Sequence, residues 1–208
     1  WYRRPQRIGF GLVYLQWRSG VVARMLKAHS KSLIVNDLEN YSAVINSCYL
    51  SNKKDFPAAA YQEYRSQILT LCEQKKIPGI ITKNYAPKND KKIQPGERVF
   101  YTHQNALLLD TYRSLIDRVV KEEEIKKYFL APLITEASVH TNTSGVFKGF
   151  YKDKNTGLGC FGASGQDALS RILGTIELKE PVLSNYESRL TIYQKDAVEL
   201  ARQLKNID

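Results

Sequence analysis

Two aspartates stand where a carboxylate can bind a polar ligand at the edge of a sheet. Asp37 follows the apolar residues Leu33–Val35 and Asn36, and Asp196 comes within three residues of the stretch Arg189–Tyr193. Open α/β sheets bind nucleotide-like ligands at the carboxyl ends of parallel strands, where an acid accepts hydrogen bonds from hydroxyl or amino groups. The pair therefore predicts one ligand at one sheet edge. The alternative role of Asp37 is to cap the helix that follows it.

A glycine-rich segment and several lysine clusters form a second group of candidates. Residues 141–165 contain six glycines between Asn, Thr, Lys and aromatic residues, which favours a hairpin or a binding loop. Lysines gather at 53–54, 75–76, 83–92 and 148–154. The last group lies among aromatic residues, a mixture that suits phosphate contact combined with base stacking. A solvated basic surface is the alternative.

Composition limits the class of protein. The 208 residues carry a formal net charge of +10, with 43% hydrophobic and 25% charged residues. This composition builds a folded core, and the basic excess favours polyanions, nucleic acid first, because phosphate contacts release counterions. No apolar run approaches the ~20 residues of a membrane span, so we expect no membrane partner. Cys48, Cys72 and Cys160 are odd in number and widely separated, which favours a reducing compartment, the cytoplasm.

Several kinds of catalytic site are missing from the sequence. We expect no metal site, because His29, His103 and His140 are far from one another and from any cysteine pair. Neither the G-x-S-x-G signature of a nucleophile elbow nor the G-x-x-x-x-G-K-[ST] signature of a phosphate loop occurs.

Hydrophobic periodicity predicts an α/β protein. The predicted strands are Ile8–Trp17, Ser32–Asp37 and Arg189–Tyr193, and the predicted helices are Val21–His29, Leu38–Leu50, Pro57–Glu73, Gln104–Val120, Lys121–His140, Asp167–Leu178 and Ala197–Leu204.

Some local features refine this prediction. Val22, Met25 and Leu26 share one side of the first helix, and Asn105 suits the cap of a later one. Pro132 is expected to kink or split its helix. The residues between Gly79 and Tyr85 suggest a short additional strand.

Four segments, in order along the chain, give a family resemblance. They are IVNDLENYSAVIN (Ile34–Asn46), ERVFYTHQNALLLDTYR (Glu97–Arg113), HTNTSGVFKGF (His140–Phe150) and RLTIYQKDAVEL (Arg189–Leu200). Together they resemble Dam-like adenine-specific DNA methyltransferases. The second is similar to that family's ER-x-[FY]-[FY]-T-x-x-N-A-x-x-[IL]-D segment, and the third to its N-x-x-G-x-F entry to target recognition.

The resemblance implies transfer of a methyl group from S-adenosylmethionine to the exocyclic amine of adenine in double-stranded DNA. It implies that Asp37 binds the cofactor ribose, that Asp196 accepts from the cofactor adenine amine, and that Gly20 lets the backbone approach the methionine moiety. Asn142, Gly145, Phe147 and Lys148 would lie near the DNA and help to position a flipped-out adenine. A non-enzymatic DNA-binding module, completed by a chain that carries the catalytic motif, is the alternative.

Two departures from the family pattern are clear. Where the family has Asp-x-Phe-x-Gly-x-Gly, the aligned positions here are Tyr14, Gln16, Arg18 and Gly20. The catalytic Asp-Pro-Pro-Tyr tetrapeptide does not occur, so no catalytic residue is assigned. We therefore expect an N-terminal fragment that is inactive alone.

The resemblance also divides the chain into expected parts. Residues 1–54 would begin a partial Rossmann-like methyltransferase sheet, with 1–17 outside the resemblance. Residues 55–182 would form a helical, loop-rich DNA-recognition insertion, and 183–208 would return to the cofactor-binding domain.

Overall fold

The computed structural model describes residues 8–15, 20–143, 149–162 and 167–204. The chain divides into two compact units. Unit 1 contains Trp1–Tyr61, Lys127–Pro132 and Glu180–Asp208, and unit 2 contains Gln62–Lys126 and Leu133–Lys179. Each unit is described by itself below.

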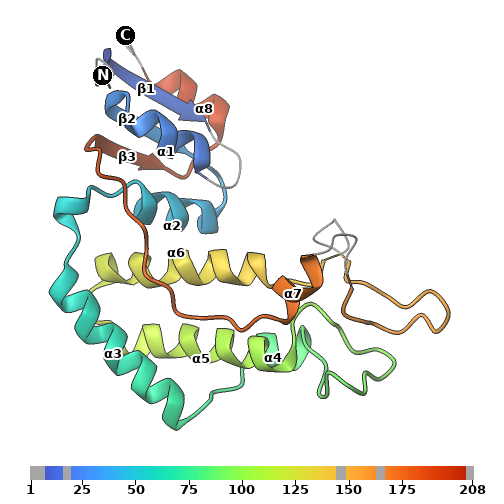
Figure 1. The fold of residues 1–208 in the computed structure, drawn as a ribbon. Helices are drawn as coiled ribbons and strands as arrows, with labels where there is room; N and C mark the ends of the chain where they lie inside the picture. Colours follow the sequence, from blue (N-terminus) through green and yellow to red (C-terminus); the bar gives the residue numbers. More distant parts are fainter. Residues whose placement is uncertain (1–7, 16–19, 144–148, 163–166, 205–208) are drawn as a thin grey trace, which may run out of the picture. The chain divides into compact units, whose positions relative to one another are not determined.

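A parallel sheet is the centre of unit 1. Its described strands are β1 (Ile8–Leu15), β2 (Ser30–Asn36) and β3 (Arg189–Tyr193), in the spatial order β1-β2-β3 (Figure 1). Leu15 pairs with Asn36 and Asn36 with Tyr193, so the three strands end level with one another. The prediction of an α/β fold is confirmed.

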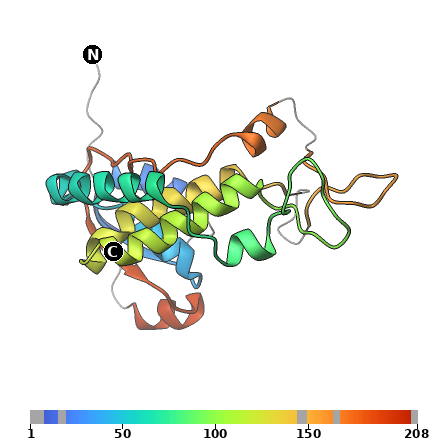
Figure 2. The same cartoon turned by 90° about the horizontal axis from the view of Figure 1, so that it is seen from below.

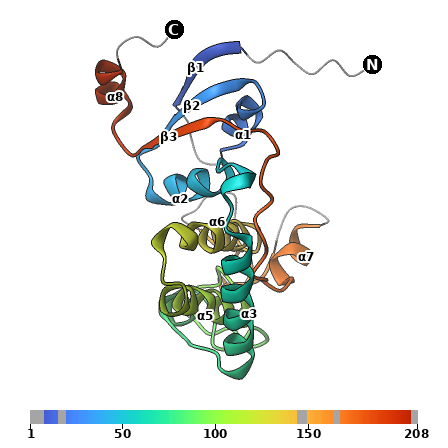
Figure 3. The ribbon, with the colours of Figure 1, turned by 90° about the vertical axis from the view of Figure 1, so that its left-hand side faces the viewer.

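Short helices follow the strands of unit 1. They are α1 (Val21–Lys27), α2 (Asn40–Tyr49), the 3-10 turn η1 (Lys53–Asp55) and α8 (Ala197–Gln203). Figures 1 and 3 show α1 and α8 on opposite faces of the sheet. A buried cluster of Ala23, Leu33, Val35 and Leu50 joins α1, β2 and the end of α2. This arrangement of parallel strands and covering helices leaves the carboxyl edge of the sheet to the loops.

The inward side of α1 differs from the predicted one. Val22 and Met25 are exposed, whereas Ala23 and Lys27 are buried. The reason is the position of the contact with β2, which Ala23 can approach closely because its side chain is small. Of the three residues predicted to share the inward side, only Leu26 packs against the core cluster.

Two stretches distant in sequence are joined just before β3. We call residues 51–54 and 185–188 the joint. Its hydrogen bonds run from Lys53 Nζ to Asn185 Oδ1 (3.2 Å), from Lys54 Nζ to Glu187 Oε2 (2.7 Å) and from Ser188 N to Asn52 Oδ1 (3.0 Å).

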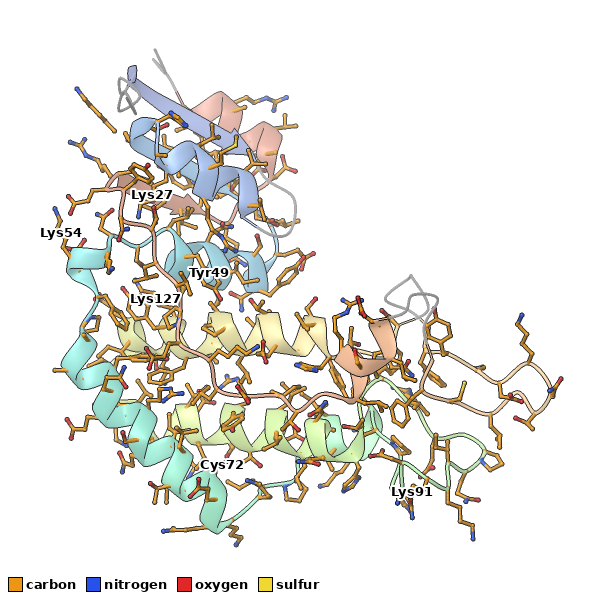
Figure 4. The ribbon with its side chains drawn as sticks, in the orientation of Figure 1. Lys27, Tyr49, Lys54, Cys72, Lys91 and Lys127 are labelled. Carbon is orange, nitrogen blue, oxygen red and sulfur yellow. The ribbon has the colours of Figure 1, made fainter. Side chains whose placement is uncertain are left out.

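The buried side of the joint involves α1. The Ser188 hydroxyl lies 2.6 Å from the Ser30 carbonyl oxygen and 3.2 Å from that of Lys27, both of which accept from it. Lys27 is fully buried and donates from Nζ to the Ser51 carbonyl at 2.7 Å (Figure 4). Burial lowers the pKa of Lys27, partly offset by the carboxylates of Glu187 and Asp55.

Unit 2 is built mainly from helices. Its helical segments belong to α3 (Ala58–Gln74), α4 (Ile80–Asn84), α5 (His103–Val119), α6 (Glu123–Val139) and α7 (Ala168–Leu173), seen from below in Figure 2. The inward side of α5 is buried along its whole length, as the 3.6-residue spacing of its apolar residues predicts. Helix α6 is continuous through Pro132, so it is not split. Among the described helices, none is long and apolar enough to cross a membrane.

Two local predictions in unit 2 are wrong. The segment after Gly79 is helix α4, not a strand, because Asp110 accepts hydrogen bonds from the N–H groups of Gly79, Ile81 and Thr82 and fixes its first turn. Asn105 is not the cap of α5. Thr102 is, and Asn105 lies inside the helix, where it binds the backbone of residues 174 and 176.

The glycine-rich segment contains a hairpin, as predicted. Antiparallel bridges join Thr143 to Phe150 and Lys152 to Gly159. The tip turns at Gly157, whose φ of 69° lies in the left-handed region that favours glycine. After the hairpin, α7 ends at Leu173 with Gly174 as its C-cap, five residues before the predicted end at Leu178.

Candidate functional site

The carboxyl edge of the sheet brings together the residues selected from the sequence. Asp37 directly follows β2, and its backbone N–H donates to the carbonyl of Tyr193, the last residue of β3. Asp37 therefore lies at the point where the level ends of two adjacent parallel strands meet.

Asn36 holds the loop after β3 to the end of β2. Its Nδ2 donates to the Lys195 carbonyl at 2.9 Å, and its Oδ1 accepts from the Lys195 N–H at 3.0 Å. Asn36 is 4% exposed, so both bonds form where water hardly competes. Asp37 and Asp196 each directly follow one of the two residues that this clamp joins. Sequence reasoning missed Asn36. Its signal is an amide at the end of an apolar strand.

Each aspartate also stabilises its own loop. Asp37 Oδ1 accepts from the Glu39 N–H at 3.0 Å, which closes a turn before α2. Asp196 Oδ1 accepts from the N–H groups of Val198 (2.9 Å) and Glu199 (3.1 Å) and caps α8. Oδ1 of Asp196 is the capping oxygen, and Oδ2 is the atom that suits an external donor.

The residue after Asp37 adds an apolar surface to this edge. Leu38 is 67% exposed, an unusual position for a large aliphatic side chain. Its carbonyl accepts from Gln194 Nε2 at 3.3 Å, which ties it to the loop after β3. An acid and an exposed aliphatic group in adjacent positions suit a ligand with hydroxyl groups attached to an apolar ring.

Gly20 begins α1 with a left-handed backbone, φ 66°. A Cβ atom at this position would lie 2.5 Å from Oδ1 of Asn46, a buried amide oxygen that accepts no hydrogen bond from the described residues. Glycine is therefore required here by the backbone and by the close approach of α2, whether or not a ligand binds.

Asn142, one of the residues predicted to lie near DNA, belongs to unit 2. It is fully buried, and its Nδ2 donates to the carbonyls of Val99 (2.7 Å) and Cys160 (2.8 Å). Its Oδ1 accepts from the Gly162 N–H at 3.3 Å, and its backbone N–H donates to Phe100. Asn142 therefore binds the segment before α5 to the C-terminal end of the hairpin.

The other residues predicted near DNA are Gly145, Phe147 and Lys148, and they lie outside the described part of the chain. Arg18, which occupies a family glycine position, lies outside it too.

Among the described residues of unit 1, the buried thiol of Cys48 is not activated as a nucleophile. Burial raises the pKa of Cys48 to about 12, so its thiol stays protonated at neutral pH. Among the described residues, no group of three or more His, Cys, Asp and Glu side chains is arranged to hold a metal ion.

His140 belongs to a buried polar cluster of unit 2. Its Nδ1 lies against the Arg171 carbonyl and its Nε2 lies 3.5 Å from Glu136, whose other oxygen binds Lys179 at 2.8 Å. These contacts attach the end of α6 to the segment around α7, which is a structural use of the histidine.

Comparison with known proteins relates part of the chain to methyltransferases. It is 31% identical over 124 residues to the Type II methyltransferase M.CviAII of Paramecium bursaria Chlorella virus 1, covering 57% of this chain and 34% of that protein. It is 27% identical over 139 residues to the Type II methyltransferase M.NlaIII of Neisseria lactamica, covering 65% and 39%. It is 28% identical over 130 residues to the modification methylase LlaI of Lactococcus lactis subsp. lactis, covering 58% and 20%.

The matched part of the chain thus spans between a fifth and two fifths of the length of these curated relatives. No family model matches the chain, and no solved structure matches it significantly. The chain is a distant relative of Type II methyltransferases over more than half of its own length.

Proposed function

We propose that this chain carries the S-adenosylmethionine site and the target-recognition region of an adenine-specific DNA methyltransferase of the restriction–modification type. The observation that supports the proposal is the Asn36–Lys195 clamp, which joins the residues directly before Asp37 and Asp196 at the carboxyl edge of a parallel sheet. The names of the three relatives support the methyltransferase class. The Rossmann-like sheet and the division at residues 54 and 182 remain part of the proposal.

The side chains at this edge fit the cofactor. Asp37 would accept hydrogen bonds from the two ribose hydroxyls, and Asp196 would accept from the adenine amine through Oδ2. The exposed side chain of Leu38 would cover a face of the nucleoside, and Gly20 would let the backbone come close to the methionine part. When bound, S-adenosylmethionine supplies an activated methyl group, and the residues named here hold and orient it.

Unit 2 would recognise the substrate, double-stranded DNA. Asn142, Gly145, Phe147 and Lys148 belong to one short segment that would approach the flipped-out adenine. Because Asn142 is buried and fully hydrogen-bonded, its part in this role is to hold the segment in place. The net charge of +10 favours the DNA backbone as the partner.

Residues 1–208 contain no Asp-Pro-Pro-Tyr segment. We propose that they bind cofactor and DNA but transfer no methyl group until that segment is supplied in the same polypeptide or by a complementary chain. A purified 208-residue protein that methylates adenine would refute this part of the proposal. We place the protein in the cytoplasm, where its three free cysteines would stay reduced.

The cofactor assignment is tested by titrating S-adenosylmethionine into the wild-type chain and into Asp37→Ala. Losing two hydrogen bonds to a carboxylate, each about 1.5–3 kcal/mol, should weaken binding at least 10-fold. Glu63→Ala, an exposed acid on α3, is the matched control and should bind as the wild type does. Equal affinity of Asp37→Ala and wild type would refute the ribose assignment.

The second candidate function is a non-enzymatic DNA-binding module. The basic charge and the exposed lysines of unit 2 favour it. DNA binding that weakens steeply with salt, with no measurable binding of S-adenosylmethionine by residues 1–208, would select it over the enzyme.

A further inference from the structure

In the loop between α4 and α5, the acids accept hydrogen bonds from backbone N–H groups. Glu97 accepts from the N–H groups of Lys88 (3.0 Å) and Gln94 (2.7 Å), one on each carboxylate oxygen. Asp90 accepts from the N–H of His103 at 2.9 Å, and the His103 ring lies 3.0 Å from the Pro87 carbonyl. These bonds give residues 85–98 a defined shape without any strand or helix.

The cations of the same loop are exposed, and the Arg98 guanidinium lies over the Tyr85 ring. Lys88, Lys91, Lys92 and Arg98 are all exposed, and Lys91 is labelled on the loop in Figure 4. In the part of the chain that the structure describes, none of the four forms an ion pair with an acid. The loop thus presents several cations while its carboxylates are engaged by backbone N–H groups.

The neighbouring hairpin, residues 149–160, repeats this arrangement. Asp153 Oδ1 accepts from the N–H groups of Asn155 (3.1 Å) and Thr156 (2.8 Å), and bonds to Thr156 hold the pKa of Asp153 below its usual value. Lys152 and Lys154, on either side of it, are exposed.

The loop and the hairpin are packed together at their bases. The rings of Phe100 and Phe150 meet edge to face with centroids 5.1 Å apart. The N–H groups of Phe100 and Tyr101 both donate to the Tyr85 carbonyl, and Asn142 binds both segments, as described above. Figures 1 and 2 show the loop and the hairpin projecting at the same end of unit 2.

We propose that residues 85–98 and the hairpin 149–160 form a rigid two-armed surface that binds the phosphate backbone of double-stranded DNA. The inference rests on the proposed function and adds to it the surface that contacts the substrate outside the target base. A polyphosphate backbone fits because the cations are exposed and project from a fixed framework whose acids are already engaged, so little order is lost on binding. Ile93, the large aliphatic side chain among residues 88–98, is only partly exposed, which favours DNA over a membrane surface.

The test is the salt dependence of binding to a short DNA duplex. In Lys88→Gln/Lys91→Gln/Lys92→Gln, the slope of log K against log salt should fall in magnitude by up to about 2.7, at ~0.9 for each phosphate that a lysine no longer neutralises. The control is Lys31→Gln/Lys75→Gln/Lys121→Gln, which removes the same charge from exposed positions elsewhere. It should keep a slope close to that of the wild type.

Equal slopes for the two triple variants would overturn the two-armed surface. If S-adenosylmethionine binding and DNA binding both persist in that case, the proposed function stands and only the surface is wrong. If the wild-type chain binds no S-adenosylmethionine, the proposed function fails, whatever the slopes. Weaker binding of the loop variant to phosphatidylserine vesicles, with DNA binding unchanged, would assign the surface to membranes instead.

Discussion

Replacing Asn142 tests whether this residue holds the hairpin in place or contacts DNA directly. Its side chain is fully buried and makes three hydrogen bonds, to Val99, Cys160 and Gly162. At about 1 kcal/mol each, Asn142→Ala should lower the free energy of unfolding of unit 2 by about 3 kcal/mol. The two carbonyls left without donors add to this loss.

Asn142→Asp sharpens the test. It keeps the acceptor for Gly162 but turns oxygen atoms toward the carbonyls of Val99 and Cys160 in place of the Nδ2 donor. At neutral pH the buried charge should make this variant no more stable than Asn142→Ala. Burial favours the neutral acid, so stability should recover as the pH falls and the carboxyl group gains a proton to donate.

Urea unfolding followed by circular dichroism gives the free energies, and hydrogen exchange of the Asn142 and Cys160 amides, which donate to Phe100 and Tyr151, reports the local effect. The reasoning would be refuted if Asn142→Ala stayed within about 0.5 kcal/mol of the wild type while DNA affinity fell. Asn142 would then act by touching the DNA directly and not by holding the hairpin.

Three further outcomes are expected. Asn36→Leu should lose about 2 kcal/mol of stability, from two bonds to the Lys195 backbone, and should weaken S-adenosylmethionine binding; a normal affinity would separate the clamp from the cofactor site. Gly20→Ala should lose at least about 1–2 kcal/mol from its left-handed backbone, and Asn46→Ala in the same chain should restore the part caused by the 2.5 Å approach, as a double-mutant cycle would measure. Backbone N–H groups of Gln94 and Lys88 hold the pKa of Glu97 below its ordinary 4.5, so this carboxylate stabilises the loop fully above that value and loses its effect as the pH falls through the lower folded pKa. Hydrogen exchange should show that the Lys88 and Gln94 amides lose protection as the pH falls. In Glu97→Gln, the protection of the same amides should not change with pH in this way.

The sequence pattern predicted an element correctly where the buried residues recur with the period of a helix or a strand. The apolar run Leu33–Val35 lies in β2, and the regular spacing from Ala106 to Val119 lies on the buried side of α5. Thr141–Gly165 was predicted as a hairpin or a loop from its glycines, and the hairpin forms there. In each case a few neighbouring residues determine the structure.

The sequence pattern predicted the wrong local structure where a side chain distant in sequence determines it. The first turn of α4 depends on Asp110, about 30 residues away, and no feature of residues 79–84 shows it. Thr102 and Asn105 both suit a helix cap. Asn105 instead binds the backbone of Gly174 and Ile176, which leaves Thr102 as the cap.

At the candidate site, the sequence supplied Asp37 and Asp196 as single residues near the ends of strands. The clamp directly before them joins positions 36 and 195, and one sequence read along its length does not reveal it. The roles assigned to Gly20, Asp37, Asp196 and Asn142 stay predictions until ligand binding is measured.

The joint before β3 bears on which parts of the chain can vary in length during evolution. Residues 51–54 and 185–188 are bonded side by side, so the roughly 130 residues between them start and finish at one place in unit 1. The parts of this segment that belong to unit 2, residues 62–126 and 133–179, can lengthen or shorten without altering the pairing of β2 with β3, since doubling the length of a loop costs only about 0.6 kcal/mol in loop closure. Chimeras that splice a relative's intervening segment between Asp55 and Ser184, with Lys127–Pro132 retained, should therefore keep the sheet intact, which would make this joint a point at which unit 2 can be exchanged.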